Sequence, residues 1–436
     1  MIVRCLKSEN SLFIDASKGF RKEDAKNRLR ERDIHKIVTT FVNTIEISGY
    51  SRMVNLGEIE NNDYNLNIPR YIDNTEEEDI QDIYAHLHGG ISERDIDNIE
   101  SLKVFKKLKN DLFEEKGQNY YGLKIDIEQL QDFVEKSEEV KGFKSDTLGV
   151  FKQWAEDNIS LLKAINNDTR SKGFIKELPE SLLEAFKPKQ LVDEYAIYQI
   201  LLDNWDVEMK DDVYMIIEND WEAKPYRIIE KNKNGKEVDK GWTCDILPKE
   251  IVINEFFKKE KEEIEELEAK SEDLERQMEE LKEENSGEEG ILEEVKNEKV
   301  NITKKDLQLK IKELQANTVD FKEDLDILEK YLWLLDEQGK VKKQIKGKEK
   351  ELDDKLLIKY AELTAEDVKR LVVEEKWLSR LEENINDELD NIILNLKTRI
   401  KELSERYAEI LPQIEQEVKE YEKKVKEHIK VMGFEI

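Results

Sequence analysis

The sequence has few residues that interrupt or cross-link a chain. Its 436 residues include six prolines, and none lies between Pro248 and Pro412. Because proline breaks a helix interior, this span can form long continuous helices. The two cysteines, Cys5 and Cys244, are far apart and form no CxxC pair. The pattern indicates neither a disulfide framework nor a zinc site, and it favours reduced thiols in a cytoplasmic protein.

Long apolar runs are also absent. No run approaches the length of about 18 apolar residues that is typical of a membrane-spanning helix. Residues 1–10 carry Arg4, Lys7 and Glu9 and have no apolar stretch, so we expect no signal peptide. The sequence therefore predicts a cytoplasmic chain with no membrane partner.

The charge balance is strongly acidic: 40% of the residues are charged and the net charge is -30. A net-acidic surface repels phosphate unless basic residues are segregated. One basic patch is present, and two readings of it stay open. It contacts DNA phosphates, or it is a solvated loop and helix face balanced by neighbouring acidic residues. The candidate phosphate contacts are Lys18, Arg21, Lys22, Arg28, Arg30 and Arg32, with Lys26 and Lys36 nearby.

Histidines are scarce, and the sequence contains only four. His86 and His88 lie two residues apart, close to Asp79 and Asp82. A metal site is one reading, but no metal-binding motif matches this spacing, and a solvated loop-edge pair is favoured. We therefore expect no metal site. The sequence also contains no recognisable Ser/His/Asp or Cys/His arrangement, so it predicts no catalytic residues.

The first 72 residues have the pattern of the end of an α/β domain. An apolar run at 11–16 predicts a buried strand, and apolar residues at helical spacing predict a helix over 32–43. Two strand-like runs at 52–56 and 64–68 flank a polar turn and predict a hairpin-like cap on a sheet. Such a remnant needs further strands or another surface to enclose a core.

The middle of the chain is helical with one change of period. Residues 73–210 have apolar residues at helical spacing and predict a helical domain. Residues 211–247 predict a small β-insertion. Its strands are expected at 213–217 and 226–231, and Asn234-Gly235 supplies the turn signal of a hairpin.

The C-terminal region, residues 248–436, contains three apolar seams, a seam being a stripe of apolar residues in heptad spacing. They lie at 249–285, 303–338 and 378–432. Two of the seams are expected to end at glycine-bearing breaks, near 286–287 and Gly339. The pattern predicts either helices folded back as an antiparallel coiled coil or bundle, or an extended rod that pairs with another chain.

Pro412 lies inside the third seam and is expected to kink or split its helix. We expect this seam to dock on a partner helix. The predicted docking residues are Leu378, Ile385, Leu389, Ile393, Leu396, Ile400 and Leu403. The predicted fold is mainly α, with an α/β remnant at 1–72, a helical domain at 73–210, a β-hairpin insertion at 211–247 and a coiled-coil or helical assembly region at 248–436.

Several segments resemble one known family. They are LFIDASKGF from Leu12, LRERDIHKIV from Leu29, DYNLNIPRYID from Asp63, DIQDIYAHLHGGI from Asp79 and LVDEYAIYQILLDNW from Leu191. Further matches begin at Gly287, Val372, Arg399 and Lys424. In this order they resemble the methylation (M) subunit of type I restriction–modification systems, which transfers a methyl group from S-adenosylmethionine to the N6 of adenine in DNA.

The resemblance implies partners and a cofactor. Two M subunits join one specificity subunit, which reads the DNA, and a restriction subunit can join them. The chemistry needs a glycine-rich strand-to-helix turn for S-adenosylmethionine and an Asn/Asp-Pro-Pro-aromatic turn for the flipped adenine. The sequence contains neither, so no catalytic or cofactor-binding residue is assigned and the status as an enzyme stays open. We expect a separate or truncated product whose methyltransferase domain belongs to another polypeptide or is lost.

Two other functions stay open. A structural coiled-coil protein unrelated to DNA methylation would explain the seams, but not the ordered segments near the N-terminus. An intact enzyme that uses residues 101–247 is a weaker alternative, because no catalytic constellation lies there. The favoured hypothesis is an assembly and DNA-positioning portion of an adenine methyltransferase, inactive alone.

Overall fold

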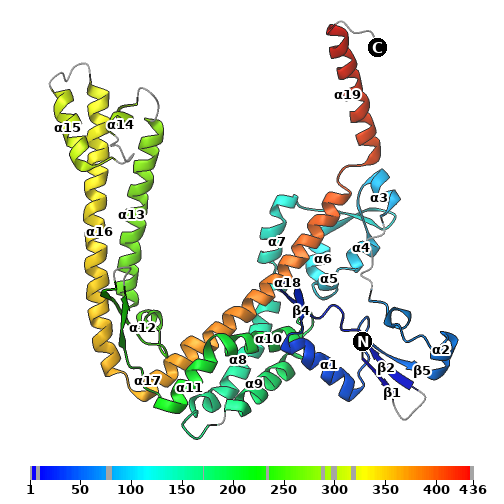
Figure 1. Ribbon diagram of the computed structural model, residues 1–436. Helices are drawn as coiled ribbons and strands as arrows, with labels where there is room; N and C mark the ends of the chain where they lie inside the picture. Colours follow the sequence, from blue (N-terminus) through cyan, green and yellow to red (C-terminus); the bar gives the residue numbers. More distant parts are fainter. Residues whose placement is uncertain are drawn as a thin grey trace. The chain divides into compact units, whose positions relative to one another are not determined.

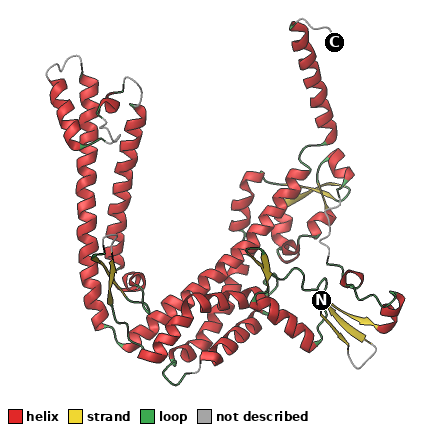
Figure 2. Cartoon of the chain, viewed as in Figure 1, coloured by secondary structure: helices red, strands yellow, loops and turns green. Residues whose placement is uncertain are grey.

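Helices make up most of the protein in the computed structural model, and the β-sheets are small (Figure 2). This confirms the predicted mainly α fold with a small N-terminal α/β region. The structure describes residues 2–5, 10–74, 81–169, 171–231, 235–285, 290–295, 302–315 and 321–432. Within these ranges no helix is long and apolar enough to cross a membrane. Asp79, one of the residues considered for a metal site, lies outside them.

The chain divides into two units. Unit 1 contains Met1–Glu218 and Trp377–Ile436, and unit 2 contains Asn219–Lys376. The third seam therefore belongs to the same compact unit as the N-terminal half, whereas the first two seams belong to unit 2. The finer division predicted at residues 72, 210 and 247 stays a prediction.

A three-stranded antiparallel sheet begins unit 1. Its order is β1-β2-β5, formed by Ile2–Cys5, Asn10–Ile14 and Ser51–Asn55. Side chains alternate across a strand, and both faces of β2 are covered, since Leu12, Phe13 and Ile14 are all fully buried. On one face Phe13 packs 4.4 Å from the ring of Tyr71 in a small core. Helix α1, Glu31–Asn43, also packs on β2.

The predicted strand at 64–68 is wrong. Helix α2, Leu56–Asn61, follows β5 directly and is capped by the Asn55 side chain, which accepts from the backbone N–H of Glu58. Asp63 and Tyr64 then adopt left-handed backbone conformations, which end any extended run. The segment continues as a turn with a 3-10 helix at Ile68–Arg70, and Ile68 and Tyr71 enter the small core. The predicted strands at 11–16 and 52–56 and the helix at 32–43 are confirmed as β2, β5 and α1.

Short and long helices form the rest of unit 1 (Figure 1). They are α3 (Ile83–His88), α4 (Glu93–Asp97), α5 (Glu100–Val104), α6 (Lys106–Leu112), α7 (Leu130–Lys136), α8 (Glu138–Lys163), α9 (Ser171–Phe186), α10 (Glu194–Asn204), α11 (Lys210–Asn219), α18 (Ser379–Arg406) and α19 (Leu411–Val431). A π-helical turn at Trp205–Met209 joins α10 to α11.

Two details of the middle region differ from the expectation. The predicted strand at 213–217 lies inside α11, because Met209, Val213 and Ile216 recur at helical spacing and are buried. A hairpin that was not predicted lies within the helical region. Its strands are β7, Phe113–Gly117, and β8, Tyr120–Leu123, and β8 also pairs with β6, Ile91–Ser92. The turn residues Gln118 and Asn119 both have positive φ, as the two central residues of a type I′ hairpin turn require.

Helix α18 packs against α7, α8 and α10. Its lower-numbered end approaches α8 and α10, and Ile393, Leu396, Ile400 and Leu403 join a large core with residues of α5–α7. Polar bonds surround this packing. Lys144 donates to Asp390 at 2.7 Å and Lys397 to Glu135 at 2.6 Å. The indole N–H of Trp377 donates to buried Asp212 at 2.8 Å.

Unit 2 is built on two long helices. Helix α13, Lys258–Glu284, runs beside α16, Lys322–Glu362. Lys355 pairs with Glu260, Lys348 with Glu263, and Gln338 donates to Glu275. Along these pairs the residue number falls in α16 as it rises in α13, so the two helices are antiparallel. The remaining elements are β9 (Tyr226–Lys231), β10 (Glu237–Thr243), α12 (Lys249–Phe256), α14 (Ile291–Glu294), α15 (Lys304–Leu314) and α17 (Ala365–Arg370).

The predicted strand at 226–231 is confirmed as β9, which pairs with β10. Asn234 of the expected hairpin turn lies outside the described residues.

The expected helix breaks had different outcomes. Ser286 and Gly287, at the first expected break, lie outside the described residues. Gly339 does not end a helix, since α16 continues through it to Glu362. Pro412 does split the third seam: α18 ends at Arg406, and α19 begins at Leu411 with proline in its first turn, where the missing N–H costs no hydrogen bond.

The α18 packing can be tested with two neighbouring residues. Ile393 is 3% exposed and Leu394 is 53% exposed. We expect Ile393→Ala to lower the free energy of unfolding of the chain alone by about 2–5 kcal/mol, because it leaves a cavity. Leu394→Ala is the control and should change it by less than about 0.5 kcal/mol. Urea denaturation of both variants measures the difference; equal, small effects would show that this face is not packed in the isolated chain.

Candidate functional site

The predicted basic patch lies on a small hairpin and the start of α1. Strands β3, Arg21–Glu23, and β4, Lys26–Arg28, pair antiparallel, with Arg21 opposite Arg28 and Glu23 opposite Lys26. Opposite residues share one face of a strand pair, so these four side chains lie together. Lys18 precedes the hairpin, while Arg30 and Arg32 flank the first residue of α1. Lys22 pairs with Asn27 and projects on the other face of the hairpin, so the hairpin divides the patch residues between two faces.

Acidic neighbours neutralise part of this patch. Glu23 accepts from both Arg21 and Arg28, and these bonds hold the pKa of its carboxyl below the usual value. Burial alone would raise the pKa of Asp33, but hydrogen bonds from Arg30 outweigh burial and lower it. Lys22 and Lys26 are exposed and form no ion pair with any residue in the described ranges. The positive charge available to a phosphate is therefore carried mainly by these two lysines.

His35 connects α1 to the helical part of unit 1. Its Nε2 lies 2.7 Å from Oε1 of Glu180 on α9, and its ring centroid lies 4.7 Å from that of Tyr198 on α10. The backbone N–H of Arg32 donates to Gln199 at 3.0 Å. Sequence reasoning assigned His35 no role. The signal that would have found it is its spacing with Arg32 and Thr39, which places all three on one polar side of α1.

Tyr50 and Lys36 belong to the same contact region. Burial, followed by the hydroxyl of Tyr195, raises the pKa of Tyr50 to about 12, so its ring is neutral at pH 7. Lys36 places its Nζ 4.8 Å from the Tyr50 ring centroid and 5.4 Å from that of Tyr195. The ammonium group of Lys36 therefore contacts aromatic rings within unit 1. This contact makes Lys36 a poor candidate for binding phosphate.

The seven predicted docking residues are buried within the chain. Leu378, Ile385, Leu389, Ile393, Leu396, Ile400 and Leu403 are each at most 9% exposed. They lie at the start of α18 and along its inner face, against α7, α8 and α10. In this packing a partner can reach them only after α18 leaves those helices. Their use as a docking surface stays a prediction.

Helix α19 carries an exposed continuation of the same seam. Its apolar residues recur in steps of three and four, and none of its residues is buried. We call this set the α19 stripe. It consists of Leu411, Ile414, Val418, Tyr421 and Val425, with His428 at the same spacing and Met432 just after the end of the helix. An amphipathic helix normally buries its apolar stripe. Among the residues that the structure describes, α19 contacts α3, and the α19 stripe is otherwise exposed.

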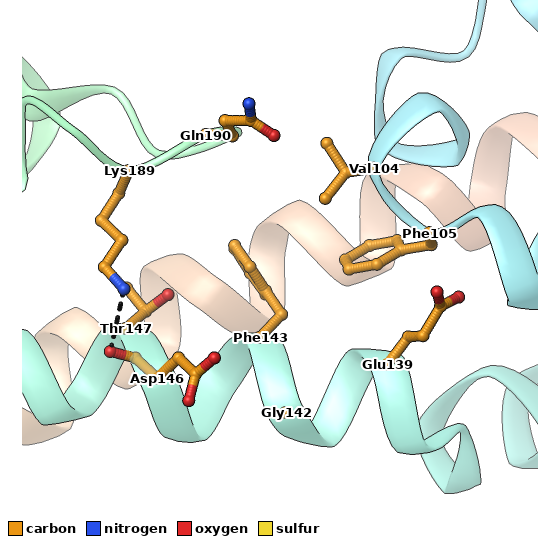
Figure 3. Close-up of a pocket in the computed structure, with 9 residues that line it drawn as sticks. All are labelled: Val104, Phe105, Glu139, Gly142, Phe143, Asp146, Thr147, Lys189 and Gln190. Carbon is orange, nitrogen blue, oxygen red and sulfur yellow. Dashed lines mark hydrogen bonds between the residues drawn. The ribbon is translucent and has the colours of Figure 1, made fainter.

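The cavity in Figure 3 lies in unit 1 and measures about 420 Å³. Phe105 and Phe143 form an apolar wall, and Glu139, Asp146 and Lys189 form a polar rim (Figure 3). Glu139 already accepts from the backbone N–H of Leu108 at 2.8 Å, and Lys189 donates to the backbone oxygen of Asp146 at 3.2 Å. The only glycine in the lining, Gly142, lies inside α8. The cavity has no strand-to-helix glycine turn.

A second cavity, of about 290 Å³, includes Gly89 and Gly90. These glycines join helix α3 to strand β6, which is the reverse of the strand-to-helix order of a nucleotide-type turn. The residues present therefore do not fit S-adenosylmethionine at either cavity. No group of three or more metal-ligating side chains occurs among the residues that the structure describes. His86 instead bonds Gln81 at 2.8 Å and lies edge-on to Tyr407.

The N-terminal segment of the chain is similar to known proteins. Residues 4–80 match the N-6 DNA Methylase family. The methylase subunit of the type I restriction enzyme MjaVII from Methanocaldococcus jannaschii is 44% identical over 79 residues, which cover 17% of this chain and 14% of that subunit. This chain is related to the methylase subunits of type I restriction enzymes.

A second subunit of the same organism, from the MjaVIII enzyme, is 35% identical over 83 residues, covering 18% of this chain and 14% of that subunit. The matches thus span about one seventh of the length of these two relatives. No solved structure matches the chain. The matched segment of this methylase-related chain contains the first sheet, the basic hairpin and α1. Full-length methyltransferases of the family use S-adenosylmethionine.

The α1 contact can be tested at His35. We expect His35→Ala to lower the free energy of unfolding by about 1–2 kcal/mol, because Glu180 loses a hydrogen-bond partner and the ring contacts are lost. Glu180→Gln keeps an acceptor at that position and should have a smaller effect. His428→Ala, on an exposed helix, is the control and should have none. Chemical denaturation at pH 7 measures all three; equal values for His35→Ala and His428→Ala would contradict the contact.

Proposed function

We propose that this chain is an assembly and DNA-positioning component of a type I DNA adenine methyltransferase. It docks on the specificity subunit through α19, contacts DNA phosphates through its basic hairpin, and does not transfer methyl groups alone. The α19 stripe carries the proposal, because a heptad stripe that stays exposed apart from the contacts of α19 with α3 has the form of a helix-docking surface. The relationship of residues 4–80 to methylase subunits supports the choice of assembly.

The flanks of the α19 stripe indicate the chemistry of the partner helix. Glu415, Glu417 and Glu422 lie beside its first half, whereas Lys424 lies beside its second half. Flanking charges set partner choice and orientation in paired helices. The partner is therefore a helix with an apolar stripe of its own and with basic residues opposite the first half of α19. The restriction subunit and a separate polypeptide with the methyltransferase domain are the further partners of this proposal.

The alternative, a structural protein unrelated to DNA methylation, accounts for the helices but gives no reason for the match at residues 4–80. The basic hairpin lies inside that match. It supports a phosphate-contacting role because Lys22 and Lys26 are not consumed by ion pairs with described residues. Such contacts position a protein on a duplex without reading its sequence.

Docking through α19 predicts that polar substitutions on the stripe weaken the complex. We expect the double variant Val418→Gln, Val425→Gln to weaken binding to the specificity subunit by about a hundredfold. Each buried valine contributes about 1.5 kcal/mol, and about 3 kcal/mol in total corresponds to that factor. The matched control is Glu420→Gln, Glu427→Gln on the outer side of α19, which should change binding by less than about threefold. Co-expression followed by calorimetry measures both; equal affinities would refute docking on this stripe.

The chain alone is expected to be inactive. It lacks both the glycine-rich turn and the Asn/Asp-Pro-Pro-aromatic turn, so neither cofactor nor flipped adenine has its binding groups. Transfer of labelled methyl groups from S-adenosylmethionine to duplex DNA should stay at background for the purified chain. A preparation that contains a methylase catalytic domain is the positive control. Transfer above background by the chain alone would contradict this part of the proposal.

A further inference from the structure

Helix α16 of unit 2 carries a lysine cluster that the α19 docking and the basic hairpin do not use. Between residues 340 and 350 the sequence has six lysines and a single acidic residue, Glu349. The chain as a whole has a net charge of -30. A local excess of positive charge in such a chain is a segregated patch, which is the condition for binding a polyanion.

The lysines of this cluster divide into two kinds. Lys340 pairs with Glu337 at 2.6 Å, and Lys348 pairs with Glu263 across the helix pair. Lys342, Lys343, Lys346 and Lys350 are exposed and form no ion pair with any residue in the described part of the chain. The first kind is paired within unit 2, and the second kind has no ion-pair partner among the described residues. We call the second kind the α16 lysine face.

The four side chains lie on one side of the helix. At about 100° per residue, Lys342, Lys343, Lys346 and Lys350 fall within an arc of about 100°. The buried residues of this stretch, Val341 and Leu352, project on another side, toward α13. Lys342, Lys346 and Lys350 follow one another at about 6 Å along the axis. The face is thus a row of regularly spaced positive charges turned to solvent.

Two glycines accompany this row. Gly339 and Gly347 lie inside α16, where glycine lowers helix stability. A Cβ at either position would meet no atom of the described protein within 4 Å, so internal packing does not require glycine there. By helical spacing Gly339 projects among the lysines and Gly347 at their edge. Glycine on an open face permits an external backbone to approach closely.

We propose that the α16 lysine face binds the phosphate backbone of duplex DNA. The proposal extends the proposed function, since it gives a DNA-positioning chain a second phosphate-contacting surface outside the family-matched segment. A regularly spaced row suits a polymer of phosphates better than a single phosphate. Lysine acts as a point charge and contacts phosphates without base readout. A membrane surface is disfavoured, because the apolar side of α16 is already covered by α13.

The test measures binding of the full chain to a fluorescent mixed-sequence duplex between about 50 and 200 mM salt. The test variant changes Lys342, Lys343, Lys346 and Lys350 to Gln. The matched control changes Lys304, Lys340, Lys348 and Lys355 to Gln, which removes the same charge from lysines that pair with Asp336, Glu337, Glu263 and Glu260. A third variant, Lys22→Ser with Lys26→Ser, reports on the hairpin.

Each phosphate contact contributes about 0.9 to the slope of log affinity against log salt. We expect the test variant to lower that slope by about 3 to 4, and the paired-lysine control to lower it by less than about 1. Equal slopes for the test and control variants would overturn the inference. Loss of binding in the hairpin variant alone would also overturn it, while leaving DNA positioning by the hairpin intact.

Two further measurements separate other occupants of this face. Binding to anionic vesicles in preference to DNA, or self-association that the test variant abolishes and the control retains, would assign the face to a membrane or to a second copy and would overturn the inference. Docking on the specificity subunit is measured separately through α19. If the wild-type chain docks there but binds no DNA at low salt, the inference fails while the assembly role stands.

Discussion

The apolar face of α18 is the constraint on which unit 1 depends. Residues at heptad spacing along this helix are buried against α7, α8 and α10, and the ion pairs of Lys144 and Lys397 lie around them. A helix from near the C-terminus thereby completes a core that begins near residue 85. Because these residues are buried within unit 1, the exposed part of the third seam lies beyond them, on α19.

Pro412 explains why the third seam is buried before residue 406 and exposed after residue 411. The apolar spacing continues through residues 378–432, but proline has no N–H to donate and cannot extend α18. The chain breaks between Arg406 and Leu411 and starts a new helix with proline in its first turn. Residues before the break are buried, and those after it form the exposed α19 stripe. Periodicity alone assigns both halves the same role, whereas the break separates an internal core from an external surface.

The lysines of α16 are likewise divided, into those that form ion pairs and those that do not. In unit 2, lysines on the inner side of α16 pair with glutamates of α13, as Lys355 does with Glu260. Exposed pairs of this kind add little stability, but they fix which residues face each other. Lysines elsewhere on α16 have no such partner among the described residues. A chain with a large negative charge can approach DNA only where positive charge is left unpaired, and the hairpin and α16 are places where the structure leaves it so.

Strong periodicity was sufficient to predict much of the fold. Strand β2, helix α1 and the long helices α13 and α18 follow from spacing and from the absence of proline. The failures were local. Residues 213–217 are apolar enough for a buried strand, and only their continuity with Met209 shows a helix. Asp63 and Tyr64 adopt left-handed conformations that no pattern revealed. Gly339 does not stop α16, because the packing of flanking residues such as Leu334 and Val341 outweighs one glycine.

The candidate surfaces were harder to predict, because exposure depends on what the rest of the chain covers. Sequence spacing selected the buried half of the third seam for docking, since Leu and Ile are denser there than in α19. It placed Lys36 in the basic patch, although that side chain lies over the rings of Tyr50 and Tyr195. His35 and the α16 lysines were not selected, because their significance depends on neighbours distant in sequence. A motif is readable along the chain, but a free surface is defined only by three-dimensional packing.

Neither basic surface has the chemistry to read a DNA sequence. The hairpin offers Lys22 and Lys26 beside arginines that are held by Glu23, and α16 offers lysines alone. Base readout in the major groove uses side chains such as arginine or asparagine in a fixed, bidentate geometry. Unpaired lysines on mobile stems supply affinity and salt dependence but little discrimination. In the proposed assembly, sequence recognition would therefore come from the partner docked on α19, and the docking helix, rather than either basic surface, would determine where on DNA the chain is placed.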